Sequence, residues 1–115
     1  MTVLGLTFKE NVPDIRNSRV VDIVRTLESF GVNVQIHDPY ASPEKAHRTY
    51  QLPLTGLHEI APSDAVIIAV GHRAYVEEGW TLVKRLLKNG GAAVLAVRSI
   101  LNKADKPDGM DLWRL

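Results

Sequence analysis

Residues 5–18 read GLTFKENVPDIRNS, and they join an apolar strand expected at residues 3–8 to an amphipathic helix expected to begin near Ser18. The stretch holds two cations, Lys9 and Arg16, between these regular elements. Connections between a strand and a helix in α/β domains usually span about two to six residues, so this one is long and rich in functional groups. Because open α/β folds bind their ligands at the carboxyl ends of the strands, the stretch is predicted to be an anion-binding loop.

Apolar patterns in the rest of the chain predict strands that alternate with helices. Further strands are expected at residues 32–38, 65–70 and 92–97, with a short edge strand at 112–115. Helices are expected from about Ser18 to Gly31, over residues 43–50 and from Trp80 to Leu87, with one helical turn at 57–60. Asn17 or Ser18 is expected to cap the first helix, and Gly31 is expected to end it. This order predicts the α/β class: a three-layer α/β/α Rossmann-like domain with a mainly parallel sheet of about five strands.

Composition narrows the class of protein. Residues 1–115 are expected to form a single domain, since a chain of this length buries one core. The net charge of +1 gives no broad basic surface, so nucleic acid is not an expected partner. No apolar run approaches the roughly 20 residues that cross a bilayer, and the first residues lack a secretory signal, so we expect no membrane segment and a cytoplasmic protein. The absence of cysteine excludes disulfides, thiolate metal sites and cysteine nucleophiles within this chain.

Functional side chains follow each expected strand at the point where it ends. Phe8, Lys9, Asp14 and Arg16 follow the first strand, Asp38 and Tyr40 the second, His72 and Arg73 the third, and Arg98 the fourth. The carboxyl ends of parallel strands meet at one edge of the sheet, and clustered lysine and arginine side chains suit phosphate oxygens there. The alternative is that charged residues merely collect in loops.

Several of these residues allow two interpretations. Asp14 either orients the Arg16 guanidinium or bonds only to amides of the loop. Phe8 either stacks on a base or sugar or belongs to the core. His72 is more often a satisfied loop residue than a catalyst, and the other histidines show no metal-binding spacing, so no metal site is expected: His37, His47 and His58.

Several common motifs are missing from the sequence. The first strand is not followed by G-x-G-x-x-G, so the dinucleotide-binding fingerprint is absent. There is no G-x-x-x-x-G-K-[ST] phosphate loop and no nucleophile elbow. The residues therefore predict a binding domain with no catalytic residue of its own.

The motifs that are present resemble a known family. The segments that carry the resemblance are Gly5-Leu6-Thr7-Phe8-Lys9, Asp14-x-Arg16-x-Ser18, His37-Asp38-Pro39 and Ala69-Val70-Gly71-His72. They resemble the C-terminal, UDP-binding domain of the UDP-glucose/GDP-mannose dehydrogenases, and the resemblance runs through essentially the whole chain. The sequence from Glu10 to Ser18 is most similar to that of the branch that acts on UDP-N-acetylhexosamines for surface polysaccharides.

This resemblance implies an activity and a set of partners. Members of the family oxidise the C6 alcohol of a nucleotide sugar to a uronic acid with two NAD⁺, on an N-terminal domain that holds NAD and a catalytic cysteine. A central helix builds a homodimer. By the match to the motif, Phe8 and Lys9 would contact the UDP-sugar, Arg16 would reach the cofactor phosphates across the domain cleft, and Arg98 would lie near the nucleotide. Asp14 and His72 would support these residues.

The chain also departs from the whole enzyme, since it contains neither the N-terminal half nor a cysteine. We therefore expect a fragment that is inactive alone. Ala96 stands where relatives commonly carry an aspartate, which weakens the assignment of Arg98. The alternative is a free-standing Rossmann-like nucleotide-binding or regulatory module without catalysis.

Overall fold

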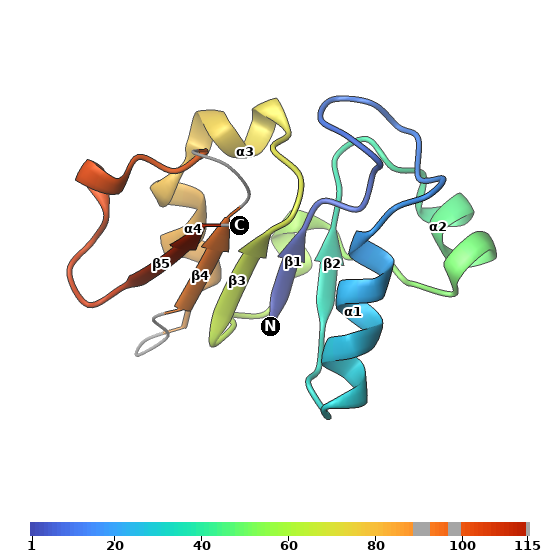
Figure 1. The fold of residues 1–115 in the computed structure, drawn as a ribbon, viewed down its shortest axis with the longest axis horizontal. Helices are drawn as coiled ribbons and strands as arrows, with labels where there is room; N and C mark the ends of the chain where they lie inside the picture. The colour runs from blue at the N-terminus through green and yellow to red at the C-terminus, as the bar shows by residue number, and fades with distance from the viewer. Residues whose placement is uncertain (89–92, 97–99, 115) are drawn as a thin grey trace.

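The framework of the protein is one five-stranded sheet in which the paired strands run parallel. The computed structural model describes residues 1–88, 93–96 and 100–114. The sheet has the order β2-β1-β3-β4-β5 (Figure 1). Its strands are β1 (Thr2–Leu4), β2 (Gln35–His37), β3 (Ala65–Ile68), β4 (Ala93–Ala96) and β5 (Asp111–Arg114). The predicted parallel sheet is confirmed, with β5 as its last edge strand.

Helices cover the sheet on both faces. The helices are α1 (Val20–Ser29), α2 (Pro43–Tyr50), α3 (Arg73–Glu78) and α4 (Trp80–Leu86), with 3-10 turns at Leu57–Glu59 and Lys103–Asp105. Successive residues of β1 point to opposite faces of the sheet: Val3 packs in the hydrophobic cluster that contains α1, and Leu4 packs in the cluster that contains α4. Figure 1 shows α1 on one side of the sheet and α4 on the other. The predicted three-layer α/β/α Rossmann-like architecture is confirmed.

The chain reverses its direction across the sheet at β1. It leaves β1 for β2 on one side and then returns to β3 on the other side, so β1 and β3 are neighbours at the centre of the sheet. Open α/β sheets bind ligands outside the carboxyl ends of the strands at such a switch point. The segments that begin after Leu4 and after Ile68 therefore meet where a ligand site is expected.

The ends of the helices were predicted with mixed success. Gly31, at φ +81°, ends α1 as expected: its N–H donates to Glu28 O, and the N–H of Val32 donates to Leu27 O. The expected cap at Asn17 or Ser18 is wrong, since α1 begins at Val20 and no side chain caps it. Arg19 already has helical backbone angles, and the Ser18 hydroxyl is buried with no hydrogen-bond partner in the described part of the chain.

The strands are shorter than predicted, and one helix was not predicted. β1 ends at Leu4, so Gly5–Phe8 belongs to the loop. Of the expected strands, β2 lacks residues 32–34 and 38, and β3 lacks residues 69–70. The short helix α3 was not predicted because it has a single buried residue, Tyr75, and so lacks the apolar stripe from which a helix is predicted. Parts of two expected strands, residues 92, 97 and 115, lie outside the described residues. Within the described residues, no helix combines the length and the apolar character that a membrane span requires.

A buried carboxylate ties the strand ends together. Asp38, directly after β2, accepts hydrogen bonds on both oxygens from groups in three segments: the N–H groups of Leu6, Thr7, Tyr40 and Ala41, at 2.7, 3.1, 2.7 and 2.9 Å, and Nε2 of His72, at 2.8 Å. Burial alone would raise the pKa of Asp38, but these hydrogen bonds to the charged form outweigh it and lower the pKa to about 2. The ionised carboxylate is therefore a structural part of the carboxyl edge of the sheet.

A glycine allows the loop to leave β1. Gly5 has φ +101°, and a Cβ at this position would lie 2.6 Å from Cβ of Val70 and 2.9 Å from its backbone nitrogen. Neither the backbone angle nor the space suits a side chain. The close approach of the two segments after β1 and β3 thus depends on a residue without a Cβ.

The substitution Gly5→Ala should lower the free energy of unfolding by about 3 kcal/mol, because overpacking adds to left-handed strain. Gly31→Ala is the matched control, since Gly31 also has a positive φ but a Cβ added there would meet nothing within 4 Å. That variant should lose only about 1 kcal/mol. Urea denaturation of both variants measures the difference. Equal losses would contradict the close packing of Gly5 against Val70.

The pKa of Asp38 predicts a pH dependence of stability. A carboxyl whose pKa falls from 3.8 to about 2 on folding stabilises the protein above pH 4, and this contribution is lost as the pH falls toward 2. The difference in free energy of unfolding between wild type and Asp38→Asn should therefore shrink by about 1 kcal/mol between pH 5 and pH 3. Urea denaturation at several pH values measures it. A difference that stays constant down to pH 3 would contradict the lowered pKa.

Candidate functional site

The loop of residues 5–19 leaves the carboxyl end of β1 and leads into α1 (Figure 1). Its arms are joined by the N–H of Phe8, which donates to Asp14 O at 2.7 Å. Tyr50, the last residue of α2, donates from its hydroxyl to Ile15 O at 2.5 Å and ties the second arm down. The long connection therefore has a defined conformation that rests on backbone and side-chain hydrogen bonds.

A shallow pocket of about 290 Å³ opens in this loop. It is lined by Phe8, Asp14, Arg16 and Asn17. Phe8 is 58% exposed, so the interpretation of Phe8 as a core residue is wrong. An aromatic face, a cation and a carboxylate thus surround one hollow at the edge of the sheet where the sequence predicted a site.

Asp14 and Arg16 form a two-point ion pair at the pocket. Nε and Nη2 of Arg16 lie 3.0 Å from Oδ1 and Oδ2 of Asp14, and the backbone N–H of Arg16 donates to the same Oδ1 at 2.9 Å. The side-chain hydrogen bonds from Arg16 lower the pKa of Asp14 to about 2. Asp14 therefore orients the guanidinium and also bonds to a loop amide, so the interpretation that it bonds only to amides is wrong. The Arg16 side chain remains 84% exposed, so the fixed guanidinium is open to an incoming anion.

The other predicted cations differ in their surroundings. Lys9 is exposed and follows Phe8 directly, but it is not among the residues that line the pocket. No hydrogen bond or ion pair of the Lys9 side chain occurs in the part of the chain that the structure describes. Arg73 is exposed at the start of α3. Arg98 lies outside the described residues.

His72 lies beneath the loop, not in the pocket, and is fully buried. The N–H of Asn11 donates to Nδ1 of His72 at 2.9 Å, so this nitrogen must offer a lone pair. The ring proton then sits on Nε2, which faces Asp38 Oδ2 at 2.8 Å and Thr7 Oγ1 at 3.1 Å. The interpretation of His72 as a satisfied residue that supports the loop agrees with this geometry.

Asp38 has a structural role that the sequence did not predict. The sequence placed this residue only among the side chains at the carboxyl ends of the strands, whereas the carboxylate is buried and holds backbone amides of other loops. The signal available in the sequence was local: an aspartate at a strand end bonds to amides a few residues on, as Asp38 does with Tyr40 and Ala41. The partners Leu6 and His72 are distant in sequence and carry no such signal.

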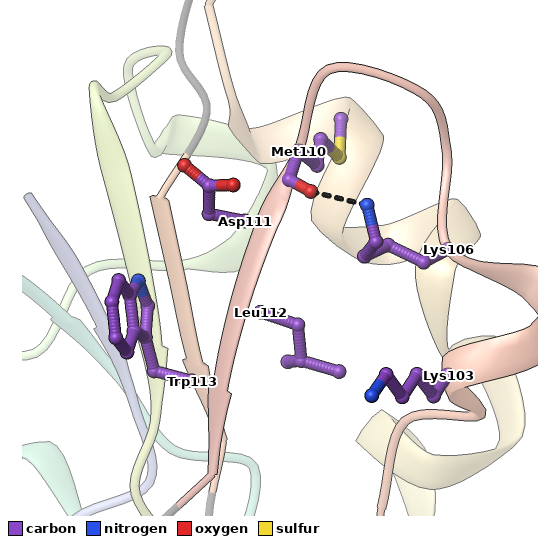
Figure 2. A pocket seen from close by; sticks show the side chains of 6 residues that line it. All are labelled: Lys103, Lys106, Met110, Asp111, Leu112 and Trp113. Carbon is purple, nitrogen blue, oxygen red and sulfur yellow. Dashed lines mark hydrogen bonds between the residues drawn. The ribbon is translucent and has the colours of Figure 1, made fainter.

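A second pocket, of about 250 Å³, lies beside β5 (Figure 2). It is lined by Lys103, Lys106, Met110, Asp111, Leu112 and Trp113. The Lys106 ammonium already donates to Met110 O at 2.6 Å. β5 stands at the opposite edge of the sheet from β2, and none of the predicted site residues lines this pocket. Among the residues that the structure describes, no group of three or more histidine, aspartate or glutamate side chains could hold a metal ion.

Comparison with known proteins places the chain in a family. Residues 2–103 match the family model described as "UDP-glucose/GDP-mannose dehydrogenase family, UDP binding domain". Protein CapL of Staphylococcus aureus is 36% identical over 115 residues, which are 100% of this chain and 27% of CapL. A UDP-N-acetyl-D-glucosamine 6-dehydrogenase of Pseudomonas aeruginosa is 40% identical over 86 residues, 75% of this chain and 20% of that enzyme. The chain thus spans about a quarter of the length of these curated relatives, or less.

Solved structures share the fold. The UDP-D-ManNAc dehydrogenase of Pyrococcus horikoshii superposes with a TM-score of 0.74 at 21% identity, over 98% of this chain and 24% of that chain. The GDP-mannose dehydrogenase of Pseudomonas aeruginosa, solved as a ternary complex, gives a TM-score of 0.68 at 18% identity, over 96% of this chain and 27% of that chain. At these identities the likeness establishes the architecture of the domain.

The sequence resemblance is therefore confirmed. The matched residues 2–103 include the whole loop that carries Phe8, Lys9 and Arg16. Two relatives at 40% identity are named as UDP-N-acetyl-D-glucosamine 6-dehydrogenases. The chain belongs to the UDP-glucose/GDP-mannose dehydrogenase family, of which it is the UDP-binding domain.

Proposed function

We propose that this chain, residues 1–115, binds the UDP part of a UDP-sugar within a longer NAD-dependent nucleotide-sugar 6-dehydrogenase. That enzyme would oxidise the C6 alcohol of the sugar to a uronic acid for surface polysaccharide synthesis. The observation that carries the proposal is the pocket of Phe8, Asp14 and Arg16 at the β1/β3 switch point. The names of the more similar relatives favour a UDP-N-acetylhexosamine as the sugar nucleotide.

The chemistry of the loop suits a diphosphate. Arg16 offers a planar guanidinium whose orientation is fixed by Asp14, and Lys9 offers a mobile point charge nearby in the chain. The exposed ring of Phe8 can stack on the uracil or the sugar. In the proposed enzyme, Phe8 and Lys9 contact the UDP-sugar, and Arg16 reaches phosphates of the cofactor across the domain cleft. In the isolated chain, which lacks the cofactor domain, the exposed Arg16 guanidinium is open to the diphosphate of UDP. Arg98 is proposed as a further basic group near the nucleotide.

The dinucleotide itself does not fit a site on this chain. β1 is followed by the loop of residues 5–19, whereas a dinucleotide site needs a tight glycine turn that leads straight into a helix. The chain also contains no cysteine. We therefore place NAD and the catalytic residues on an N-terminal domain of the parent enzyme, which we propose to be a cytoplasmic homodimer. No catalytic residue is assigned to the chain itself.

Titration of the chain with UDP by isothermal calorimetry should show saturable binding, weak because the other half of the cleft is missing. Lys9→Ala and Arg16→Ala should each weaken it by roughly tenfold or more, since each removes a charge-assisted contact to phosphate. In the parent enzyme the same substitutions should lower kcat/KM by similar or larger factors.

The chain offers matched controls for this experiment. Arg85 on α4 pairs with Glu78 at 3.4 Å as an exposed arginine–carboxylate pair, and Lys84 beside it is an exposed lysine. Arg85→Ala and Lys84→Ala should leave UDP binding unchanged. Uridine without phosphates should bind more weakly than UDP. Equal binding of uridine and UDP, or wild-type affinity in both loop variants, would contradict the assignment.

A further inference from the structure

The exposed tip of the loop is held at both ends by buried polar groups. Phe8 and Lys9 are exposed, so packing contributes little to their placement. Immediately before them, the N–H groups of Leu6 and Thr7 donate to Asp38 Oδ2 at 2.7 and 3.1 Å. Two residues after Lys9, the N–H of Asn11 donates to His72 Nδ1. The two residues assigned to the UDP-sugar thus sit between two anchors.

His72 couples these two anchors. Its Nε2 donates to the same Asp38 oxygen that receives Leu6 and Thr7, and its Nδ1 receives Asn11. Because a neutral imidazole carries one proton, the bond to Asp38 keeps that proton on Nε2 and leaves the Nδ1 lone pair for Asn11. Each of the two hydrogen bonds therefore holds the ring in the tautomer and orientation that the other bond requires.

Asn11 connects the tip to the segment after β3 a second time. Its Oδ1 accepts the backbone N–H of Arg73 at 2.7 Å, so Asn11 bonds to two successive residues of that segment. Asn11 also has φ 60°, a left-handed conformation that asparagine tolerates better than most residues. The position of the tip relative to β3 therefore rests on specific hydrogen bonds.

The anchoring groups themselves are out of reach of a ligand in this conformation. His72 is 0% exposed, Thr7 is 1% exposed and Asp38 is 8% exposed. Aromatic rings close the His72 ring in, with centroids at 4.9 Å for Tyr40 and 5.6 Å for Tyr75. Asp38 and His72 can act on a bound nucleotide only through the backbone that they hold.

We propose that Asp38 and His72 are positioning residues of the nucleotide site, which hold the segment of residues 6–11 in the conformation that presents Phe8 and Lys9 to the UDP-sugar. This role rests on the proposed function. A loop that is ordered before the ligand arrives loses less conformational entropy on binding. The latch, meaning Asp38, His72 and the amides of Leu6, Thr7 and Asn11, thereby contributes to affinity without a contact to the ligand.

Two substitutions of His72 each break one of its two hydrogen bonds and keep the other. In His72→Asn, the side-chain oxygen can take the place of Nδ1 and accept from Asn11, but the shorter side chain does not reach Asp38. In His72→Gln, the amide nitrogen can take the place of Nε2 and donate to Asp38, but Asn11 loses its acceptor. Each variant should weaken UDP binding by about tenfold or more, since each breaks one half of a coupled pair of buried hydrogen bonds.

Ser63→Ala is the matched control for buried polar loss. Ser63 Oγ and Thr2 Oγ1 form an equally buried pair at 2.5 Å, at the amino ends of β3 and β1 and so on the opposite edge of the sheet. This variant should be destabilised but should bind UDP like wild type. Asn11→Gly serves if the His72 variants fail to fold, because Asn11 is exposed and glycine keeps the positive φ. It should bind UDP a few-fold more weakly.

Amide hydrogen exchange without ligand supplies a readout independent of UDP. In His72→Gln the Asn11 amide should exchange at least tenfold faster than in wild type, while the amide of Val66 in the central strand β3 keeps its protection. Faster exchange together with weaker binding supports the proposal. Faster exchange with unchanged UDP affinity would overturn it, and so would unchanged exchange or an equal affinity loss in Ser63→Ala. If wild type binds no UDP while the His72 variants release Asn11, the proposed function fails and the loop-holding role stands.

Discussion

The Asp38 carboxylate accepts hydrogen bonds from the segments that follow β1, β2 and β3, and the carboxyl edge of the sheet is built around it. A buried charge without partners would cost several kcal/mol. Here the amides of Leu6, Thr7, Tyr40 and Ala41, together with His72, surround both oxygens. These groups would otherwise be buried donors without acceptors. One charged group thus satisfies the polar backbone of several loops and fixes their relative positions.

This arrangement differs from the usual phosphate site of Rossmann-like sheets. There a tight glycine turn brings phosphate to the amino end of the first helix. In the proposed site the turn is replaced by the loop of residues 5–19, and the positive charge would come from the side chains of Lys9 and Arg16. Side chains need orientation that helix amides do not. Asp14 supplies it to Arg16 directly, and the latch supplies it to the tip that carries Lys9.

The sequence was sufficient for the order of the strands but not for helix α3 or for the network beneath the loop. Strands such as Ala65–Ile68 are short apolar runs that reveal themselves locally, and Gly31 ends α1 by a local backbone conformation. The pocket residues Phe8, Asp14 and Arg16 were identified because they follow a strand in one continuous loop. The hydrogen bonds that Leu6 donates to Asp38 and Asn11 donates to His72 join residues far apart in the chain, so no periodic pattern in the sequence indicates them. The start of α1 also differs from the prediction, because the Ser18 side chain is buried and does not cap the helix.

A crystal structure of the chain with UDP tests the central claim most directly, since it shows both the ligand and the loop that receives it. The account predicts the diphosphate beside Arg16 and Phe8, with the Asn11 N–H still on His72 and Leu6 still on Asp38. UDP bound away from the β1/β3 edge, or a loop whose tip has left Asp38 and His72 to meet the ligand, would contradict it.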